Sequence, residues 1–256
     1  ISQDNHMMAV AEDFQGRRQY RLSLRNLHNG AWLTDVIENT SGNMLWSNDG
    51  STLFYVRNHP QTLMPYQVYR HRIGTPLAQD RLIYQENDGA FYLTLSRLTS
   101  DRYLAITLGS NTTSEVHLLD ADHPDAQPVL FAARRSGVEY YLDHFNSTFY
   151  LRSNHENANF GLYQAKNNHD VWQPLVAPQN DNMVEGFALF QNWLVVAERR
   201  DGLSQIRKIN WKTHAEQTLD FDDASYMAWL GYNPDSQTHQ LRYGYSSMTT
   251  PTSSYA

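Results

Sequence analysis

Gln19-Tyr20-Arg21-Leu22-Ser23-Leu24 is the first of five similar short segments in this chain. The later copies are Tyr66-Gln67-Val68-Tyr69, Ser114-Glu115-Val116-His117-Leu118, Phe160-Gly161-Leu162-Tyr163 and Ser204-Gln205-Ile206-Arg207. When the copies are aligned on Leu22, Val68, Val116, Leu162 and Ile206, the intervals are 46, 48, 46 and 44 residues. A nearly constant period of this length is typical of repeat architectures, in which each repeat is one supersecondary unit.

A second strand-like segment precedes each copy and keeps the same period. Its occurrences are His6–Val10, Leu53–Val56, Tyr103–Ile106, Phe149–Leu151, Trp193–Val196 and Leu241–Tyr243. Alternating apolar residues, with Asn, Asp, Gly and Pro at the breaks, leave room for four antiparallel strands in each repeat. Four strands in about 40–50 residues is the size of a β-propeller blade. A β-sandwich is the simpler all-β alternative, but a sandwich does not require a constant period.

We therefore predict an all-β protein, a β-propeller with four complete four-stranded blades and a partial blade at each end. The complete blades are expected at residues 42–87, 91–134, 138–178 and 183–222. Residues 1–256 then form one propeller domain that is incomplete at both ends. The side chains expected to be buried between blades are Trp46, Tyr103, Val116, Phe149, Leu162, Trp193 and Ile206.

The composition excludes several classes of function. The net charge is −7 and the Lys and Arg residues are dispersed, which argues against a nucleic-acid partner. No apolar run approaches the roughly 18 residues that span a bilayer, so no membrane role is expected. The chain has no cysteine, which rules out disulfides and thiolate metal sites and fits a reducing compartment. We expect a cytoplasmic location.

No catalytic or cofactor motif is complete. The segments Gly202–Ile206 and Gly244–Met248 resemble the Gly-x-Ser-x-Gly nucleophile elbow, but both lack the second glycine and no helix is expected after either. The 11 histidines are scattered and form no metal-binding pattern. The sequence also has no glycine-rich phosphate loop. We therefore expect no catalytic residue, no metal and no cofactor in this chain.

One charged turn is a candidate site. Glu12 and Asp13 precede Gly16, and Arg17 and Arg18 follow it, where two strands of the first blade are expected to join. The simplest interpretation is a solvated hairpin tip in which Glu12 or Asp13 pairs with Arg17 or Arg18, which stabilises little. Arginine at a blade rim is also suited to bind the carboxylate of a partner domain or ligand. The pairs Arg134-Arg135 and Arg199-Arg200 occupy similar places.

The sequence also resembles a known family along essentially its whole length. The segments that carry the resemblance are Ala9–Phe14, Arg17–Tyr20, Pro65–Val68, His71–Pro76, Phe149–Asn154, Asn159–Tyr163 and Leu241–Pro251. They are similar to the propeller of the oligopeptidase B (protease II) group in the prolyl oligopeptidase family of serine peptidases.

The resemblance implies a domain that belongs to a larger enzyme. In that family a seven-bladed propeller caps an α/β-hydrolase domain that carries the Ser-Asp-His triad and cleaves short peptides after Arg or Lys. The implied role of this chain is to gate access for short basic peptides and to exclude folded proteins. Its implied partner is its own hydrolase domain, with Arg18 as the candidate bridge between the domains. The alternative is a free-standing propeller that serves as an interaction scaffold.

Overall fold

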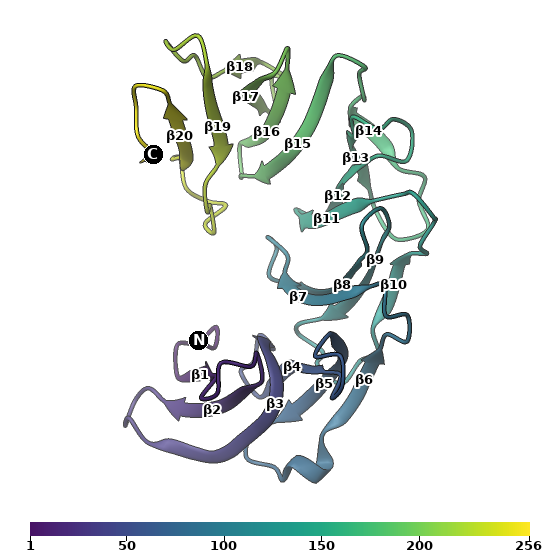
Figure 1. Ribbon diagram of the computed structural model, residues 1–256, viewed down its shortest axis with the longest axis vertical. Helices are drawn as coiled ribbons and strands as arrows, with labels where there is room; N and C mark the ends of the chain where they lie inside the picture. Colours follow the sequence, from purple (N-terminus) through teal and green to yellow (C-terminus); the bar gives the residue numbers. More distant parts are fainter. The chain divides into compact units, whose positions relative to one another are not determined.

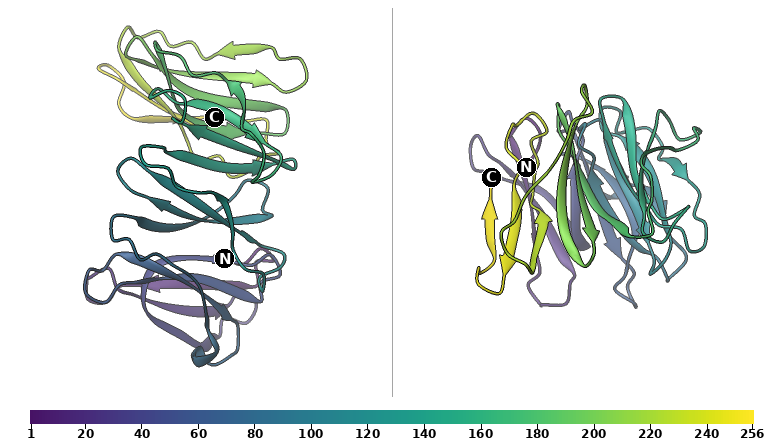
Figure 2. Two further views of the ribbon diagram at one scale, coloured as in Figure 1. Left: turned by 90° about the vertical axis from the view of Figure 1, so that its right-hand side faces the viewer. Right: turned by 90° about the horizontal axis from the view of Figure 1, so that it is seen from above.

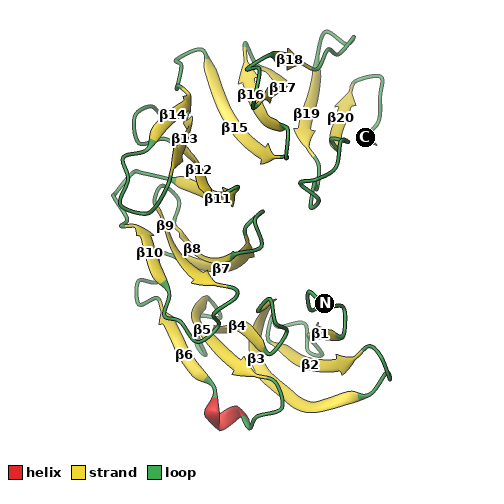
Figure 3. Ribbon diagram, turned by 180° about the vertical axis from the view of Figure 1, so that it is seen from behind, coloured by secondary structure: helices red, strands yellow, loops and turns green.

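Strands make up almost all of the regular structure in the computed structural model, which describes every residue from Ile1 to Ala256 (Figure 1). The exception is one short 3-10 turn, η1 (Leu77–Gln79), drawn in red in Figure 3. The prediction of an all-β chain is therefore confirmed. None of the described elements is a helix long and apolar enough to cross a membrane.

The first of two compact units, Ile1–Gly137, contains two antiparallel sheets. The first sheet runs in chain order: β1 (Met7–Glu12), β2 (Tyr20–Asn26), β3 (Trp32–Trp46), β4 (Thr52–Asn58), β5 (Pro65–Arg72) and β6 (Arg81–Gln85). The second contains β7 (Tyr92–Arg97), β8 (Tyr103–Gly109), β9 (Ser114–Asp120) and β10 (Val129–Ala132). Each strand pairs with its neighbours in the sequence, as antiparallel hairpins do.

The second unit, Val138–Ala256, contains three antiparallel sheets (Figure 2). Two are four-stranded: β11 (Tyr140–Phe145), β12 (Thr148–Ser153), β13 (Gly161–Ala165) and β14 (Gln173–Val176), then β15 (Asn182–Leu189), β16 (Trp193–Arg200), β17 (Leu203–Asn210) and β18 (Glu216–Thr218). The third has three strands: β19 (Tyr226–Leu230), β20 (Tyr243–Ser247) and β21 (Ser253–Tyr255). Each of the four predicted blade ranges thus contains four consecutive antiparallel strands, and the number of blades in a closed ring stays a prediction.

β3 departs from the predicted strand boundaries. The sequence predicts that a new blade begins at residue 42, but in the structure β3 crosses this position without a break and pairs with both β2 and β4. The backbone bends inside β3, where Asn39 and Gly42 have φ of 60° and 82°. A Cβ at Gly42 would lie 3.1 Å from the ring of Tyr20, so glycine permits both this backbone conformation and the close packing.

The residues that define the sequence period are the most buried positions of the sheets. Leu22, Val68, Leu162 and Ile206 are 0% exposed and Val116 is 1% exposed. The strand before Leu22, β1, contains no buried residue, but in the strand before each of the other four residues consecutive side chains are buried, as in Leu53–Val56 of β4. Successive side chains of a strand point to opposite faces, so this strand is covered on both faces. Burial on both faces explains why its sequence is a continuous apolar run.

Two of the seven side chains predicted to be buried are only half-buried. Trp46, Val116, Phe149, Leu162 and Ile206 are buried as predicted, whereas Tyr103 and Trp193 are not. Both exceptions are the first residue of their strand, where the covering side chains end. A cation lies over each ring, from Arg102 at 5.1 Å and from Lys208 at 5.0 Å respectively, and both rings remain partly exposed.

We predict that Leu162→Ala lowers the free energy of unfolding by about 2–5 kcal/mol, because a fully buried leucine leaves a cavity when it is truncated. The matched control is Leu82→Ala on β6, where the leucine is 47% exposed and the expected loss is within about 0.5 kcal/mol. Urea unfolding of the two variants and the parent measures the difference. Equal midpoints for both variants would contradict the assignment of Leu162 to the core.

Candidate functional site

The charged turn between β1 and β2 is held by Asp13. The Asp13 carboxylate accepts hydrogen bonds from the backbone N–H groups of Gln15, at 3.1 Å, and Arg18, at 2.6 Å. Arg18 adopts a left-handed backbone with φ of 59°. Desolvation raises the pKa of Asp13, but the backbone N–H groups that it accepts outweigh this effect and lower the pKa below its usual value. Asp13 therefore shapes the turn as an anion bound by main-chain donors.

The expected ion pair at this turn is not formed. No carboxylate lies within 4.0 Å of the guanidinium of Arg17 or Arg18, and Glu12 is exposed. The prediction that Glu12 or Asp13 pairs with one of the arginines is wrong, because the backbone N–H groups occupy the Asp13 oxygens and both guanidinium groups extend into solvent. The turn thus offers two cations without an acidic partner.

Arg18 lines a hollow of about 400 Å³ in the first unit. Its other walls include Tyr20, Asn43, Asn58 and Tyr92, and none of the lining residues is acidic. The main-chain carbonyl of Arg18 accepts a hydrogen bond from Asn58 Nδ2 at 2.8 Å, which fixes the turn against the end of β4. The other amide atom, Asn58 Oδ1, is buried without a partner. The hollow therefore presents one cation and no acidic group, which suits a ligand with a carboxylate.

The other two arginine pairs, Arg134-Arg135 and Arg199-Arg200, differ from Arg17-Arg18 because each contains an arginine that is bound to a carboxylate. Arg134 Nη2 lies 2.6 Å from Glu86 Oε2 and 3.0 Å from Glu115 Oε1, and its guanidinium stacks over Phe91 at 3.9 Å. Burial raises the pKa of Glu115, but the Arg134 guanidinium outweighs it and lowers that pKa to about 2. Arg199 pairs with Glu185 at 2.7 Å. Arg134 and Arg199 are each bound to carboxylates of their own unit. Arg18 has no such partner and is the more available cation for a group from outside.

The two serines in the half-complete elbow motifs lack an activating base. Ser204 is 1% exposed and its hydroxyl has no hydrogen-bond partner. Ser246 lies in the middle of β20, opposite Met227. Nucleophilic catalysis requires a serine within hydrogen-bond reach of an oriented base. Neither serine meets this requirement, and no group of three or more His, Asp or Glu side chains could hold a metal ion.

Sequence reasoning missed a buried Asp-His-Asp cluster in the first unit. His71 is 0% exposed, with Nδ1 2.7 Å from Asp80 Oδ1 and Nε2 3.2 Å from Asp35 Oδ2. The Asp35 carboxylate also accepts the Gly74 N–H at 2.6 Å, and the Tyr55 hydroxyl donates to Asp80 at 2.8 Å. The cluster joins β3, β5 and the η1 connection. Its members are far apart in the sequence, so no local motif marks it.

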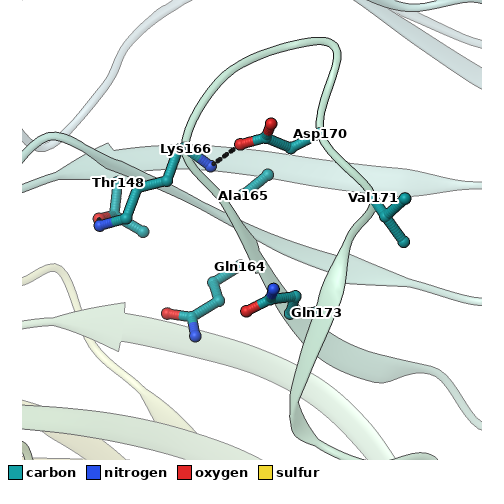
Figure 4. A pocket seen from close by; sticks show the side chains of 7 residues that line it. All are labelled: Thr148, Gln164, Ala165, Lys166, Asp170, Val171 and Gln173. Carbon is teal, nitrogen blue, oxygen red and sulfur yellow. Dashed lines mark hydrogen bonds between the residues drawn. The ribbon is translucent and has the colours of Figure 1, made fainter.

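A second hollow, in the second unit, is shown in Figure 4. It has a volume of about 250 Å³ and lies beside the turn between β13 and β14. Its charged groups already have partners: the Lys166 ammonium donates to the Thr148 hydroxyl at 3.0 Å, and Asp170 accepts the Lys166 N–H at 2.8 Å. These bonds stabilise the turn.

The comparisons with known proteins agree with this geometry. The family described as "Prolyl oligopeptidase, N-terminal beta-propeller domain" matches residues 1–256. This chain belongs to that family. Dipeptidyl aminopeptidase BI of Pseudoxanthomonas mexicana is 39% identical over 100% of the chain, and Protease 2 of Moraxella lacunata is 28% identical over 100%. The resemblance to the prolyl oligopeptidase family is thereby confirmed.

The solved structures support the same fold for this propeller domain. Oligopeptidase B from Leishmania major matches 97% of the chain and 37% of its own length with a TM-score of 0.89 and 26% identity. Oligopeptidase B from Trypanosoma brucei, with covalently bound antipain in a closed form, matches with a TM-score of 0.80 at 23% identity, which shows the fold alone. The chain spans little more than a third of the curated relatives, 36% and 37% of their lengths.

We expect the buried cluster to make the stability of the propeller domain depend on pH. Burial lowers the pKa of His71, but the hydrogen bonds that its ring donates to Asp80 and Asp35 outweigh burial and raise that pKa above its usual value. A raised pKa in the folded state means that the contribution to stability is complete below about pH 6.5, the usual value for histidine. The contribution is lost as the pH rises through the higher folded-state pKa.

We predict that His71→Gln lowers the free energy of unfolding by about 1–3 kcal/mol at pH 6, and that this difference from the parent shrinks as the pH rises toward 9. Denaturant unfolding of parent and variant at several pH values measures the difference. The other ionisable groups nearby, Asp35, Asp80, Tyr55 and Arg57, are the same in both proteins. A difference that stays constant with pH would contradict a charged His71.

Proposed function

We propose that this chain is the substrate-gating propeller of a serine oligopeptidase that cleaves short peptides after Arg or Lys. The propeller excludes folded proteins and admits short basic peptides to an α/β-hydrolase domain supplied by the rest of the polypeptide. The observation that carries the proposal is Arg18, an exposed guanidinium without a carboxylate partner at a hollow that has no acidic lining. Family membership and the oligopeptidase B relatives support the choice of enzyme class.

The gating mechanism follows from the position of Arg18. The Asp13 hydrogen bonds fix the turn, so the guanidinium can reach a neighbouring domain while its backbone stays in place. We propose that it pairs with a carboxylate of the hydrolase domain when the two domains close. An ion pair that forms only in the closed state adds stability to that state alone, and so shifts the equilibrium toward closure.

The longer relatives support a larger parent protein. Because the chain spans 36–37% of those relatives, we propose that the rest of the polypeptide completes a seven-bladed ring and supplies the Ser-Asp-His triad. A cytoplasmic location is part of the same proposal. Family membership favours this interpretation over a free-standing interaction scaffold, because the matched family is a domain of peptidases.

The name of one relative favours a second candidate specificity. Dipeptidyl aminopeptidase BI, at 39% identity, is named for removal of dipeptides from a free N-terminus. We expect the complete peptidase to hydrolyse benzyloxycarbonyl-Arg-Arg-p-nitroanilide at least about a hundredfold faster, in kcat/KM, than its Ala-Ala counterpart. Steady-state kinetics with the blocked substrates and with unblocked Arg-Arg-p-nitroanilide decide between the specificities. Cleavage of the unblocked substrate alone would contradict the proposed endopeptidase and favour the dipeptidyl aminopeptidase.

In the complete peptidase, Arg18→Ala is expected to lower kcat/KM for basic peptides about tenfold, because the closed state loses its interdomain ion pair. The melting temperature should not change, since the Arg18 guanidinium makes no hydrogen bond or ion pair within its own unit. The matched control is Arg81→Ala on β6, an exposed arginine that is outside the hollow. Equal kcat/KM for the parent and Arg18→Ala would leave the turn as a solvated hairpin tip.

A further inference from the structure

The second unit contains a slot with one half-buried cation that has no anionic partner. The slot has a volume of about 270 Å³ and is lined by Phe190, Trp193, Lys208, His239 and Gln240 among others. It lies where the connection between β19 and β20 covers the starting end of β16 and the closing end of β17. The backbone of Gln191 donates to Ser236 at 2.9 Å, which attaches this connection to the turn before β16.

The floor of the slot is aromatic and apolar. Phe190 and Val195 are buried, while Trp193, which also lines the slot, is half-buried. The sequence predicts that Trp193 is buried in the core. Its half-exposure is therefore a departure from ordinary packing. Ligand sites are usually concave, with apolar walls and a few polar groups that fix orientation. The exposed indole surface is suited to contact with a flat apolar group.

Lys208 supplies the charge at this site. Its ammonium lies 5.0 Å from the centre of the Trp193 ring, and no carboxylate lies within ion-pairing distance of it. Glu198 on β16 and Glu216 on β18, the strands that flank β17, are both bound to Arg207, at 2.6 and 2.8 Å. The cation is therefore free to bind an anion from outside, in a chain whose net charge is −7.

We propose that this slot binds a carboxylate attached to an aromatic group, as in the C-terminal aromatic residue of a peptide. The aromatic ring lies on Trp193 and Phe190, the carboxylate binds the Lys208 ammonium, and the Gln240 amide is placed to bond a peptide group. The chemistry differs from that of the Arg18 hollow, which has no stacked tryptophan. It also differs from the hollow in Figure 4, where the lysine is bonded to Thr148. The site is independent of the proposed peptidase activity.

The test is equilibrium binding of N-acetyl-L-phenylalanine to the full-length protein by isothermal titration calorimetry. We expect a Kd on the order of 1 mM. N-acetyl-L-phenylalanine amide, which lacks the carboxylate, should bind about tenfold more weakly. Lys208→Gln should weaken binding of the acid by the same factor and leave binding of the amide unchanged, because the lost interaction is the same one.

The matched control is Lys212→Gln, an exposed lysine just beyond β17 that is outside the slot, and it should bind as the parent does. The acid and the amide are compared on the parent protein. This comparison therefore remains valid even if the Lys208 variant is unstable. A tripeptide ending in phenylalanine should compete with the acid, and inorganic phosphate should not. Equal binding of acid and amide, unchanged binding by Lys208→Gln, or competition by phosphate alone would overturn the proposal.

Discussion

Burial of the strand pair at the centre of each sheet is the constraint on which this structure depends. In each four-stranded group the second strand is buried on both faces, and the third carries one fully buried anchor such as Leu162 or Ile206. A sheet with two apolar faces is stable only when other sheets cover both of them. The repeat therefore cannot fold as an isolated unit, and the loops at the strand ends are the parts that are free to carry function.

The basic residues also differ between the covered centre of the sheets and the ends of the strands. Arg134 and Arg207 lie against partly covered strands, and each is held by two carboxylates, because a buried cation without counter-charge is costly. Arg18 and Lys208 lie near strand ends beside hollows and have no such partner. The unpaired cations thus mark the places where the molecule can bind something from outside. All four residues are basic and lie on or beside strands, so only the presence or absence of a carboxylate partner distinguishes Arg134 and Arg207 from Arg18 and Lys208.

The family assignment and the geometry address different questions. The match to the N-terminal propeller domain of the prolyl oligopeptidases establishes the family of the chain. The geometry shows that the turn at Arg18 carries an exposed guanidinium without a carboxylate partner, and the gating role of this residue is the proposal. The buried Asp35-His71-Asp80 cluster joins segments of the first unit that are distant in the chain, and the slot at Lys208 is the proposed binding site of the second unit.

The sequence by itself determined the all-β class, the period and the buried anchors, because side-chain alternation and turn residues act locally and repeat along the chain. It also placed the turn at Gly16 and the candidate Arg18. Only the tertiary structure decided which charges are paired. Arg134 and Arg18 occupy similar positions in the sequence, yet Glu86 and Glu115 bind the first, while Asp13 is taken by backbone N–H groups beside the second. The continuity of β3 and the half-exposure of Trp193 likewise depend on contacts between segments distant in the chain, which no local pattern records.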